Sequence, residues 1–391
     1  MTHPASIRTK RLRPALAAAL ALWGLALLPS GAAANKTNAP QPSVLEPDVA
    51  QTSPKFRETL AKAQGGDIHA QNEVGIALAL GKGAPKAPAE AVRWWTLASE
   101  KGLAGAQFNL ALAYDQGRGV AQNAATAAEL YEKAAAQGNV PAMYNLAELL
   151  SNGNGVPMNL RQAARYYLSA AQKGHVKAMY NLALAYSRGK GLERDDAKAA
   201  QWMQKAAEAD HPRAQYLLAQ MYAQGIGVPK DTTKAAHWLE RAAKSGHARA
   251  QYSFALHCQQ GQGVPASPQA AQRWYREAAG RNHTGAMCNL ALMLLDGQAG
   301  DKNPAEAEAL LIRAGELGDP KAQYNLGLLY QEGLALPKNL PQAYYWFGLA
   351  ARYGQAEARQ HRDVVGKSLS SAEREGLDAR VSAFAPKAPS K

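Results

Sequence analysis

The chain alternates between two kinds of segment in which apolar residues recur at helical spacing. In the stretch 177–188, Leu182 and Tyr186 are four residues apart, which places them on one face of a helix. The stretch 196–208 has the same period. The residues between these stretches include Gly189 and Gly191, which permit left-handed or otherwise strained backbone. The pattern therefore predicts two helices joined by a glycine-containing turn.

This two-helix unit recurs every 36 residues. Four positions keep their residue type without interruption through at least eight units, beginning at Ala70, Gly81, Ala91 and Ala98. A period of this size indicates a solenoid, in which each unit buries its apolar face against its neighbours. Short alanine side chains let helices approach closely, and larger side chains fill the remaining space. We assign this core role, in preference to ligand stacking, to Trp94, Trp202, Trp238, Trp274 and Trp346.

The start of the second helix of most units is marked by a residue that accepts hydrogen bonds at a helix N-terminus. Asparagine, aspartate and serine are favoured there because their side-chain oxygens bond to free backbone N–H groups of the first turn. The predicted caps are Asn123, Asn159, Asp195, Asp231, Ser267, Asn303 and Asn339.

The repeated phrase A-x-x-x-L-[AG]-x-x-Y-x-x-G-x-G-V-x-x-[DN]-x-x-x-A-x-x-[WY]-x-x-x-A-A-x-x-G resembles the Sel1-like repeat, a relative of the tetratricopeptide repeat. The resemblance implies an all-α, right-handed α-solenoid of eight helix-turn-helix units over residues 67–355. Some units depart from the phrase. Asp210 and Asn282 replace the closing glycine, and Ala299 and Ala335 replace the second loop glycine. We expect looser or kinked joints at these positions.

The first 34 residues have the layout of a secretory signal peptide. A basic segment ends at Arg13, the apolar stretch 15–28 follows, and Ala32-x-Ala34 provides a cleavage site. Fourteen apolar residues are too few to span a bilayer comfortably, which leaves an uncleaved membrane anchor as the weaker alternative. We therefore expect a periplasmic or secreted protein that is cleaved after Ala34.

The remaining segments flank the repeats. Residues 53–66 predict a helix that caps the N-terminal end of the array, and residues 356–380 predict capping helices at the other end. Residues 35–52 and 381–391 are polar and rich in proline, so we expect a disordered linker and a disordered tail.

Asparagine and tyrosine form a repeated pair on the first helix of many units. In tetratricopeptide relatives, an asparagine at the matching position grips a bound peptide backbone. An amide side chain both donates and accepts hydrogen bonds, and tyrosine adds apolar area with a polar tip. We therefore predict a groove for a protein or peptide partner on the concave face. The alternative is that the asparagines bond to backbone groups of the next unit and stabilise the stack. The predicted binding residues, here called the Asn/Tyr ladder, are Asn109, Tyr144, Asn145, Tyr180, Asn181, Tyr216, Tyr252, Asn289, Tyr324 and Asn325.

Histidine also recurs with the 36-residue period, but we expect no metal site. Packed helices lie about 8–10 Å apart, whereas zinc ligands lie about 2 Å from the metal, so histidines from four successive repeats cannot share one ion. We interpret the histidines as turn residues between units. We also expect no disulfide, because Cys258 and Cys288 fall at different levels of neighbouring helices. The histidines are His175, His211, His247 and His283.

The net charge and the sequence motifs limit the classes of function that we expect. The formal charge is +13, and +9 remains beyond residue 34. A mildly basic surface suits acidic partners or anionic envelope surfaces, and no dense basic run points to nucleic acid. Signatures of nucleotide binding, zinc proteolysis and serine hydrolysis are missing, and we expect neither a cofactor nor a catalytic site.

The sequence therefore predicts an exported, non-enzymatic scaffold that binds a protein or peptide partner. The family resemblance implies roles in envelope assembly, signalling or host interaction. Two alternatives stay open. A cell-wall binder would use the positive charge and the tyrosines, and a weak β-lactam hydrolase would follow some cysteine-rich relatives.

Overall fold

The computed structural model describes residues 52–333 and 336–387. These residues form 19 α-helices and contain no β-strand, which confirms the prediction of an all-helical repeat array. The predicted signal peptide and almost all of the predicted linker lie outside the described residues, as does Ala335.

Each repeat contributes two helices of 13 residues, which we call its A helix and its B helix. The A helices are α2 (Ile68–Leu80), α4 (Ala104–Gln116), α6 (Val140–Asn152), α8 (Val176–Arg188), α10 (Pro212–Gln224), α12 (Ala248–Gln260), α14 (Thr284–Asp296) and α16 (Pro320–Glu332). The B helices are α3 (Pro88–Glu100), α5 (Ala124–Ala136), α7 (Leu160–Gln172), α9 (Asp196–Glu208), α11 (Thr232–Lys244), α13 (Pro268–Gly280), α15 (Pro304–Glu316) and α17 (Leu340–Arg352).

Three further helices lie at the ends of the array. They are α1 (Pro54–Gln64), α18 (Ala356–Gly366) and α19 (Ser371–Ala383). The predicted tail starts later than residue 381, because α19 continues through that position and Val381 is buried. Beyond the helix, the backbone N–H of Lys387 donates to the carbonyl of Glu316 at 2.8 Å, so the described part of the tail packs against α15.

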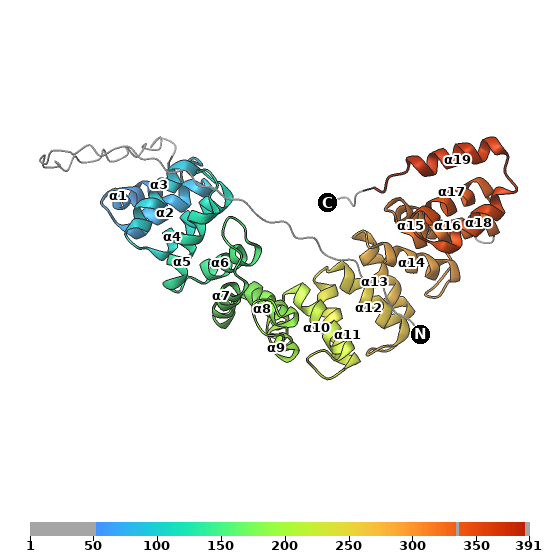
Figure 1. Ribbon diagram of the computed structural model, residues 1–391, viewed down its shortest axis with the longest axis horizontal. Helices are drawn as coiled ribbons and strands as arrows, with labels where there is room; N and C mark the ends of the chain where they lie inside the picture. The colour runs from blue at the N-terminus through green and yellow to red at the C-terminus, as the bar shows by residue number, and fades with distance from the viewer. Residues whose placement is uncertain (1–51, 334–335, 388–391) are drawn as a thin grey trace, which may run out of the picture. The chain divides into compact units, whose positions relative to one another are not determined.

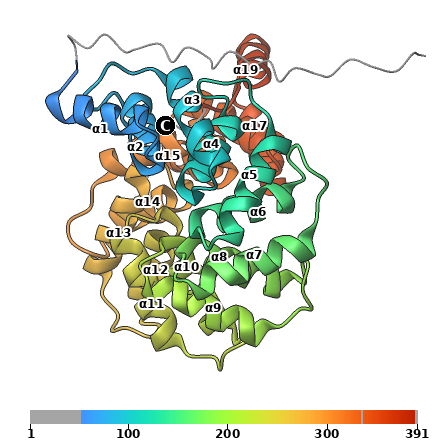
Figure 2. The same ribbon diagram turned by 90° about the vertical axis from the view of Figure 1, so that its left-hand side faces the viewer.

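Successive helices pack against one another in chain order, as Figure 1 and Figure 2 show for the central repeats. The alanine positions of the repeat form the contact surface. Ala178, Ala199 and Ala206 each have no exposed area, so a larger side chain at any of them would collide with a neighbouring helix. Trp94, Trp238 and Trp346 are buried as predicted, whereas Trp202 and Trp274 are half-buried.

The predicted caps of the B helices are confirmed. The carboxylate of Asp195 accepts from the backbone N–H of Lys198 at 2.8 Å, and the other six predicted residues make the equivalent bond. These bonds satisfy free N–H groups of the first turn and start each B helix at a defined residue.

The two glycines of the turn between the A and B helices have different structural roles. Gly189 ends α8 in the left-handed conformation, with φ of 64°. Gly191 has φ of 73°, and a Cβ placed on it would lie 2.1 Å from the carbonyl oxygen of Leu160, the first residue of α7. Gly227 meets Asp196 of α9 in the same way, at 1.9 Å. The second glycine is therefore the point at which one repeat touches the backbone of the repeat before it.

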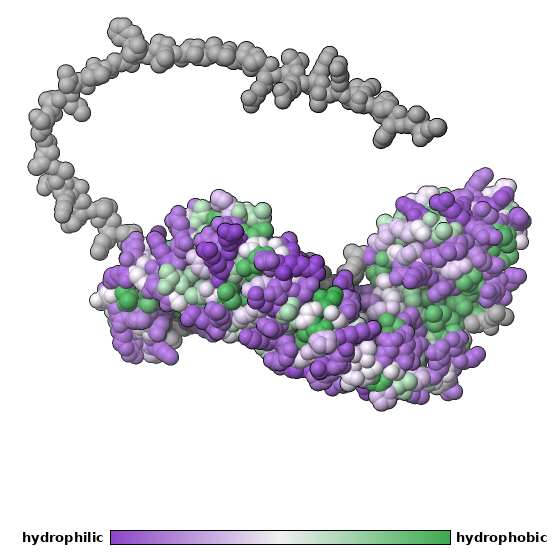
Figure 3. Space-filling model, turned by 60° about the horizontal axis from the view of Figure 1, so that its bottom comes forward, coloured by the Kyte–Doolittle hydropathy of each residue, from purple (hydrophilic) through white to green (hydrophobic). Residues whose placement is uncertain are grey.

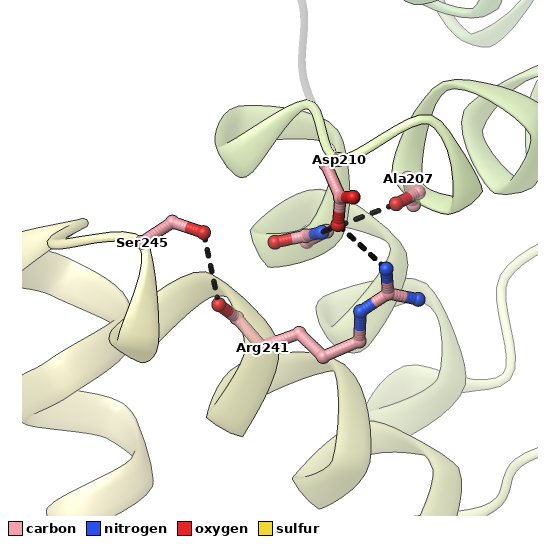
Figure 4. Close-up of polar contacts among 5 residues, drawn as sticks. Ala207, Asp210, Arg241 and Ser245 are labelled. Carbon is pink, nitrogen blue, oxygen red and sulfur yellow. Dashed lines mark hydrogen bonds and ion pairs between the residues drawn. The ribbon is translucent and has the colours of Figure 1, made fainter.

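Two turns between a B helix and the next A helix lack the glycine that ends the other repeats, but their backbone keeps the same left-handed conformation. Asp210 and Asn282 adopt φ of 58° and 62°, in the left-handed region that these two residue types tolerate better than others. An arginine of the next B helix holds each of them. Arg241 forms an ion pair with Asp210 at 2.6 Å (Figure 4), and Arg313 donates to Asn282 at 2.5 Å. The expected loosening is therefore not seen at these two joints.

The turn that contains Ala299 follows a different course. Ala299 does not adopt a positive φ, and the N–H of Gly300 instead donates to the carbonyl of Gly297 at 3.4 Å. An alanine side chain would be strained in the left-handed backbone that the other repeats use at this position. The turn between α14 and α15 is therefore reshaped rather than strained.

Alanine in place of the second glycine of the turn between an A helix and its B helix should destabilise the array far more than alanine in place of the glycine that follows a B helix. We expect Gly174→Ala to cost about 1 kcal/mol, because Gly174 has a positive φ but nothing lies within 4 Å of the place that a Cβ would take. Gly227→Ala carries the same backbone strain plus a backbone collision, so we expect a loss of more than about 3 kcal/mol. Urea unfolding followed by circular dichroism measures both. Equal losses in the two variants would contradict the assigned inter-repeat contact.

Candidate protein-interaction face

The predicted binding residues all lie on A helices and are half-buried. Tyr180 and Asn181 occupy equivalent places in α8 to Tyr144 and Asn145 in α6. The ladder is interrupted in the middle of the array. Leu217 and Ser253 take the asparagine position in α10 and α12, and Cys288 takes the tyrosine position in α14.

Four asparagines of the ladder donate hydrogen bonds to other side chains. Asn145 Nδ2 donates to the hydroxyl of Tyr131 at 3.0 Å, and Asn289 Nδ2 donates to the hydroxyl of Tyr275 at 3.1 Å. These contacts join an A helix to the B helix that precedes it. In the part of the chain that the structure describes, the ladder asparagines make no side-chain bond to the backbone of the next unit. Their bonds to side chains of the preceding repeat nevertheless connect the stack, which is the structural part of the alternative interpretation.

The other two asparagine bonds reach back to the preceding A helix. Asn181 Nδ2 donates to the carboxylate of Glu148 at 2.7 Å, and Asn109 Nδ2 donates to the side-chain oxygen of Asn72 at 2.9 Å. The hydroxyl of Tyr167 also donates to Glu148. Burial and this carboxylate together raise the pKa of Tyr167, so the hydroxyl keeps its proton. Glu148 is thereby held by two donors from neighbouring helices.

Four ladder tyrosines are stacked on histidines of the following turn, whereas the ring of Tyr324 lies edge-on to His361 of α18, with 81° between the ring planes. Tyr180 lies 4.7 Å from His211 between ring centroids, with 29° between the ring planes. Tyr144, Tyr216 and Tyr252 make the same contact with the next histidine along the chain, at 4.5–4.9 Å. One face of each of these four tyrosines is therefore covered by a histidine of the chain.

The same histidines are the N-terminal caps of α8, α10, α12 and α14. Nδ1 of His211 accepts from the backbone N–H of Ala214 at 3.2 Å, and the other three histidines make the identical bond. This confirms that they are turn residues and adds a role that the sequence did not reveal. Asn139 and Asp319 cap α6 and α16 from the same position of the repeat.

Accepting through Nδ1 requires the neutral ring. Burial, helped by the nearby cations Arg213 and Lys177, lowers the pKa of His211 below its usual 6.5. Burial is also the largest cause of the lowered pKa of the other three histidines. A protonated ring carries N–H on both nitrogens and makes no cap bond of this kind.

A row of buried glutamines, which we did not predict from the sequence, also connects the repeats. Gln215 is fully buried, and its Nε2 donates to the carbonyl of Ala207 near the end of α9, at 3.1 Å. The same carbonyl also accepts from the backbone N–H of Asp210 at 3.1 Å, so the glutamine adds a second bond at the end of the helix. A glutamine recurring at the 36-residue period was the available signal. The members are Gln71, Gln107, Gln215, Gln251 and Gln323.

A groove of about 600 Å³ lies over the N-terminal parts of α8 and α10. We call it the A-face groove. Its polar lining combines ladder residues, capping histidines and two exposed cations, Lys177 and Arg213. The full lining is Tyr144, Glu148, Lys177, Tyr180, Asn181, His211, Pro212, Arg213, Ser245, Gly246 and His247.

Reactive thiols, metal sites and membrane-spanning helices are not evident among the described residues. Cys258 and Cys288 are both buried free thiols, and burial raises the pKa of Cys288 to about 12. In the two described ranges, no three residues of the His, Cys, Asp and Glu types are placed to hold a metal ion. Every helix in those ranges is too short or too polar to cross a bilayer. The surface in Figure 3 is mainly hydrophilic, with hydrophobic residues in small groups.

These features define an α-helical repeat protein whose A helices share one face. The family model described as the Sel1 repeat matches eight consecutive segments, so the chain belongs to the Sel1 repeat family. Proteins of this family are generally protein-interaction scaffolds. The matched segments are 68–103, 104–139, 140–175, 176–211, 212–247, 248–283, 284–319 and 320–354.

Two solved structures illustrate the likeness. The protective antigen c5321 of uropathogenic Escherichia coli, which displays an SLR fold, is 30% identical, with 83% of this chain and 70% of that chain covered and a TM-score of 0.78. A Sel1 repeat protein from Oxalobacter formigenes is 26% identical, with 83% and 96% covered and a TM-score of 0.62. The search of curated proteins found no match.

Stability should fall as the pH drops below about 6.5, because the capping histidines have lowered pKa values in the folded chain. The unfolded chain binds protons first, so their contribution is complete above 6.5 and is lost as the pH falls through the folded pKa values. Each lost cap costs about 1 kcal/mol. Thermal unfolding across this range measures the effect.

A quadruple variant with asparagine at His175, His211, His247 and His283 is the matched control, since Asn139 caps α6 from the same position. We expect it to keep its melting temperature over this pH range. An unchanged pH dependence in the variant would show that other groups are responsible.

Proposed function

We propose that this chain is an exported, non-enzymatic scaffold that binds a protein or peptide partner along its A helices. The A-face groove carries the proposal, because it gathers half-buried amide and phenol groups with two exposed cations. Clefts lined by apolar rings and a few polar groups that point inward are typical of binding sites.

The ladder asparagines are suited to a peptide backbone. Each amide has two N–H donors and a carbonyl oxygen, and Asn145 and Asn181 each use one N–H within the chain. The remaining donor and acceptor match the carbonyl and N–H of a peptide unit, whatever its side chain. The internal bonds fix the orientation of the amide before a partner arrives, which reduces the entropy lost on binding.

The cellular setting is proposed from the N-terminus. The basic segment, the apolar stretch 15–28 and the Ala32-x-Ala34 site support export with cleavage after Ala34. The related E. coli protein is described as a protective antigen, which also favours an exported role. In this setting the scaffold would serve envelope assembly, signalling or host interaction.

A photo-crosslinking amino acid placed on the A helices should capture the partner in living cells. We expect p-benzoylphenylalanine at Tyr216 to give a discrete adduct of higher mass on a denaturing gel, because this side chain lies on the proposed face. The same amino acid at Lys230, an exposed residue of the turn between α10 and α11, is the control. Adducts from Lys230 alone would contradict the proposed face.

The asparagines should contribute to binding more than to folding. We expect Asn145→Ser with Asn181→Ser to reduce the adduct yield at Tyr216 at least fivefold, at a cost in stability of about 1 kcal/mol for each lost hydrogen bond. Ser253 occupies this position naturally in α12. The matched control replaces the exposed Asn152 and Asn154 by serine. A large fall in melting temperature with an unchanged adduct yield would assign the ladder to stability alone.

Export should be visible at the N-terminus of the mature protein. We expect the chain recovered from the periplasm or the medium to begin at Asn35, as measured by mass spectrometry of the intact protein. Ala34→Phe should leave an uncleaved precursor, because signal cleavage requires a small residue at this position. A full-length chain confined to the cytoplasm would contradict export.

A further inference from the structure

Three cations occupy equivalent positions in three consecutive A helices. Lys177, Arg213 and Arg249 are each the second residue of their helix, in α8, α10 and α12. All three side chains are exposed, and within the described residues none of them forms an ion pair. We call these three residues the cationic stripe.

The stripe and the ladder share a face. Lys177 is three residues before Tyr180 and four before Asn181, a spacing that places side chains side by side on a helix. Arg213 and Arg249 stand in the same relation to Tyr216 and Tyr252. Lys177 and Arg213 both line the A-face groove. A partner that lies on the ladder therefore passes the cations.

The carboxylates near the groove are already engaged. Glu148, the carboxylate among the described residues that line the groove, accepts from Asn181 and Tyr167. Asp210, which precedes the cap of α10, is paired with Arg241. The N-terminal ends of α8, α10 and α12 add positive partial charge at the same edge. The groove therefore has a surplus of positive charge that the chain does not neutralise.

We propose that the partner is an extended peptide segment with an acidic side chain at about every third residue. Consecutive packed repeats are about 10 Å apart, and an extended segment in the polyproline II conformation has three residues per turn and advances about 3.1 Å per residue, so carboxylates three residues apart lie on one side of the segment and meet successive cations. The inference rests on the proposed function and specifies the chemistry of its partner. A peptide is favoured over an anionic polysaccharide because the amide of Asn181 and the tyrosine edges beside the cations match peptide groups.

The test measures binding of labelled peptides to the full chain by fluorescence anisotropy. The first probe repeats Ser-Glu-Ala four times, and the second has glutamine in place of each glutamate. We expect the acidic probe to bind at least about tenfold more tightly, and its affinity to fall as the salt concentration rises. Equal binding of the two probes, or no binding of the acidic one, would overturn the proposal.

Two triple variants assign the effect to the stripe. Lys177→Gln, Arg213→Gln and Arg249→Gln together should weaken the acidic probe about tenfold, because three exposed ion pairs are lost. Lys190→Gln, Lys230→Gln and Lys302→Gln remove the same charge from exposed turn residues and should change affinity less than about twofold. Equal weakening by both sets would contradict a specific site. Melting temperatures verify that both variants fold.

The peptide-binding experiment can fail without contradicting the proposed function. If the Tyr216 crosslink forms in cells but the acidic probe has no advantage, the A helices bind a partner of different chemistry and this inference alone fails. If neither occurs, both fail. Dextran sulfate is the competing anion. Binding of dextran sulfate that depends on the stripe, without binding of the acidic peptide, would assign the groove to a polyanion and overturn the peptide.

Discussion

The array depends on how closely one repeat approaches the backbone of the repeat before it. At Gly191 and Gly227 the turn of one repeat lies where a side chain would overlap the first residue of the preceding B helix. Fully buried alanines extend the same close approach along the helices. These contacts repeat every 36 residues, and each is made between neighbours in the chain, so the stability of the array is built from nearest-neighbour terms.

This packing places the polar groups of the A helices in register. Because each repeat meets the next in the same way, Tyr144 and Tyr180 stack on histidines that cap the following A helix. One histidine thereby ends a turn, starts a helix and stacks on a tyrosine of the proposed interaction face. The proposed face is consequently held by the same contacts that hold the fold.

Much of the architecture was predictable from the sequence, and the exceptions have physical causes. Asn, Asp and Ser are common caps, so the B-helix starts were evident, whereas a histidine cap works only in the neutral form and gave no such signal. The buried glutamines were not predicted, because Gln215 resembles any surface glutamine in the sequence until the carbonyl of Ala207 in the preceding B helix is placed beside it. The partners of Asn145 and Asn181 depend on which neighbouring side chain reaches them, Tyr131 in one repeat and Glu148 in the other. The joint at Asp210 keeps its form through Arg241, a contact 31 residues away.

The central claim is that the N-terminal halves of the A helices are where a partner binds. Hydrogen–deuterium exchange of the full chain, with and without the partner recovered by crosslinking, tests it most directly. The account predicts that exchange slows in the first turns of α8, α10 and α12 and stays unchanged in the turns that follow these helices. Protection confined to the B helices, or to the glycine-containing turns, would contradict it.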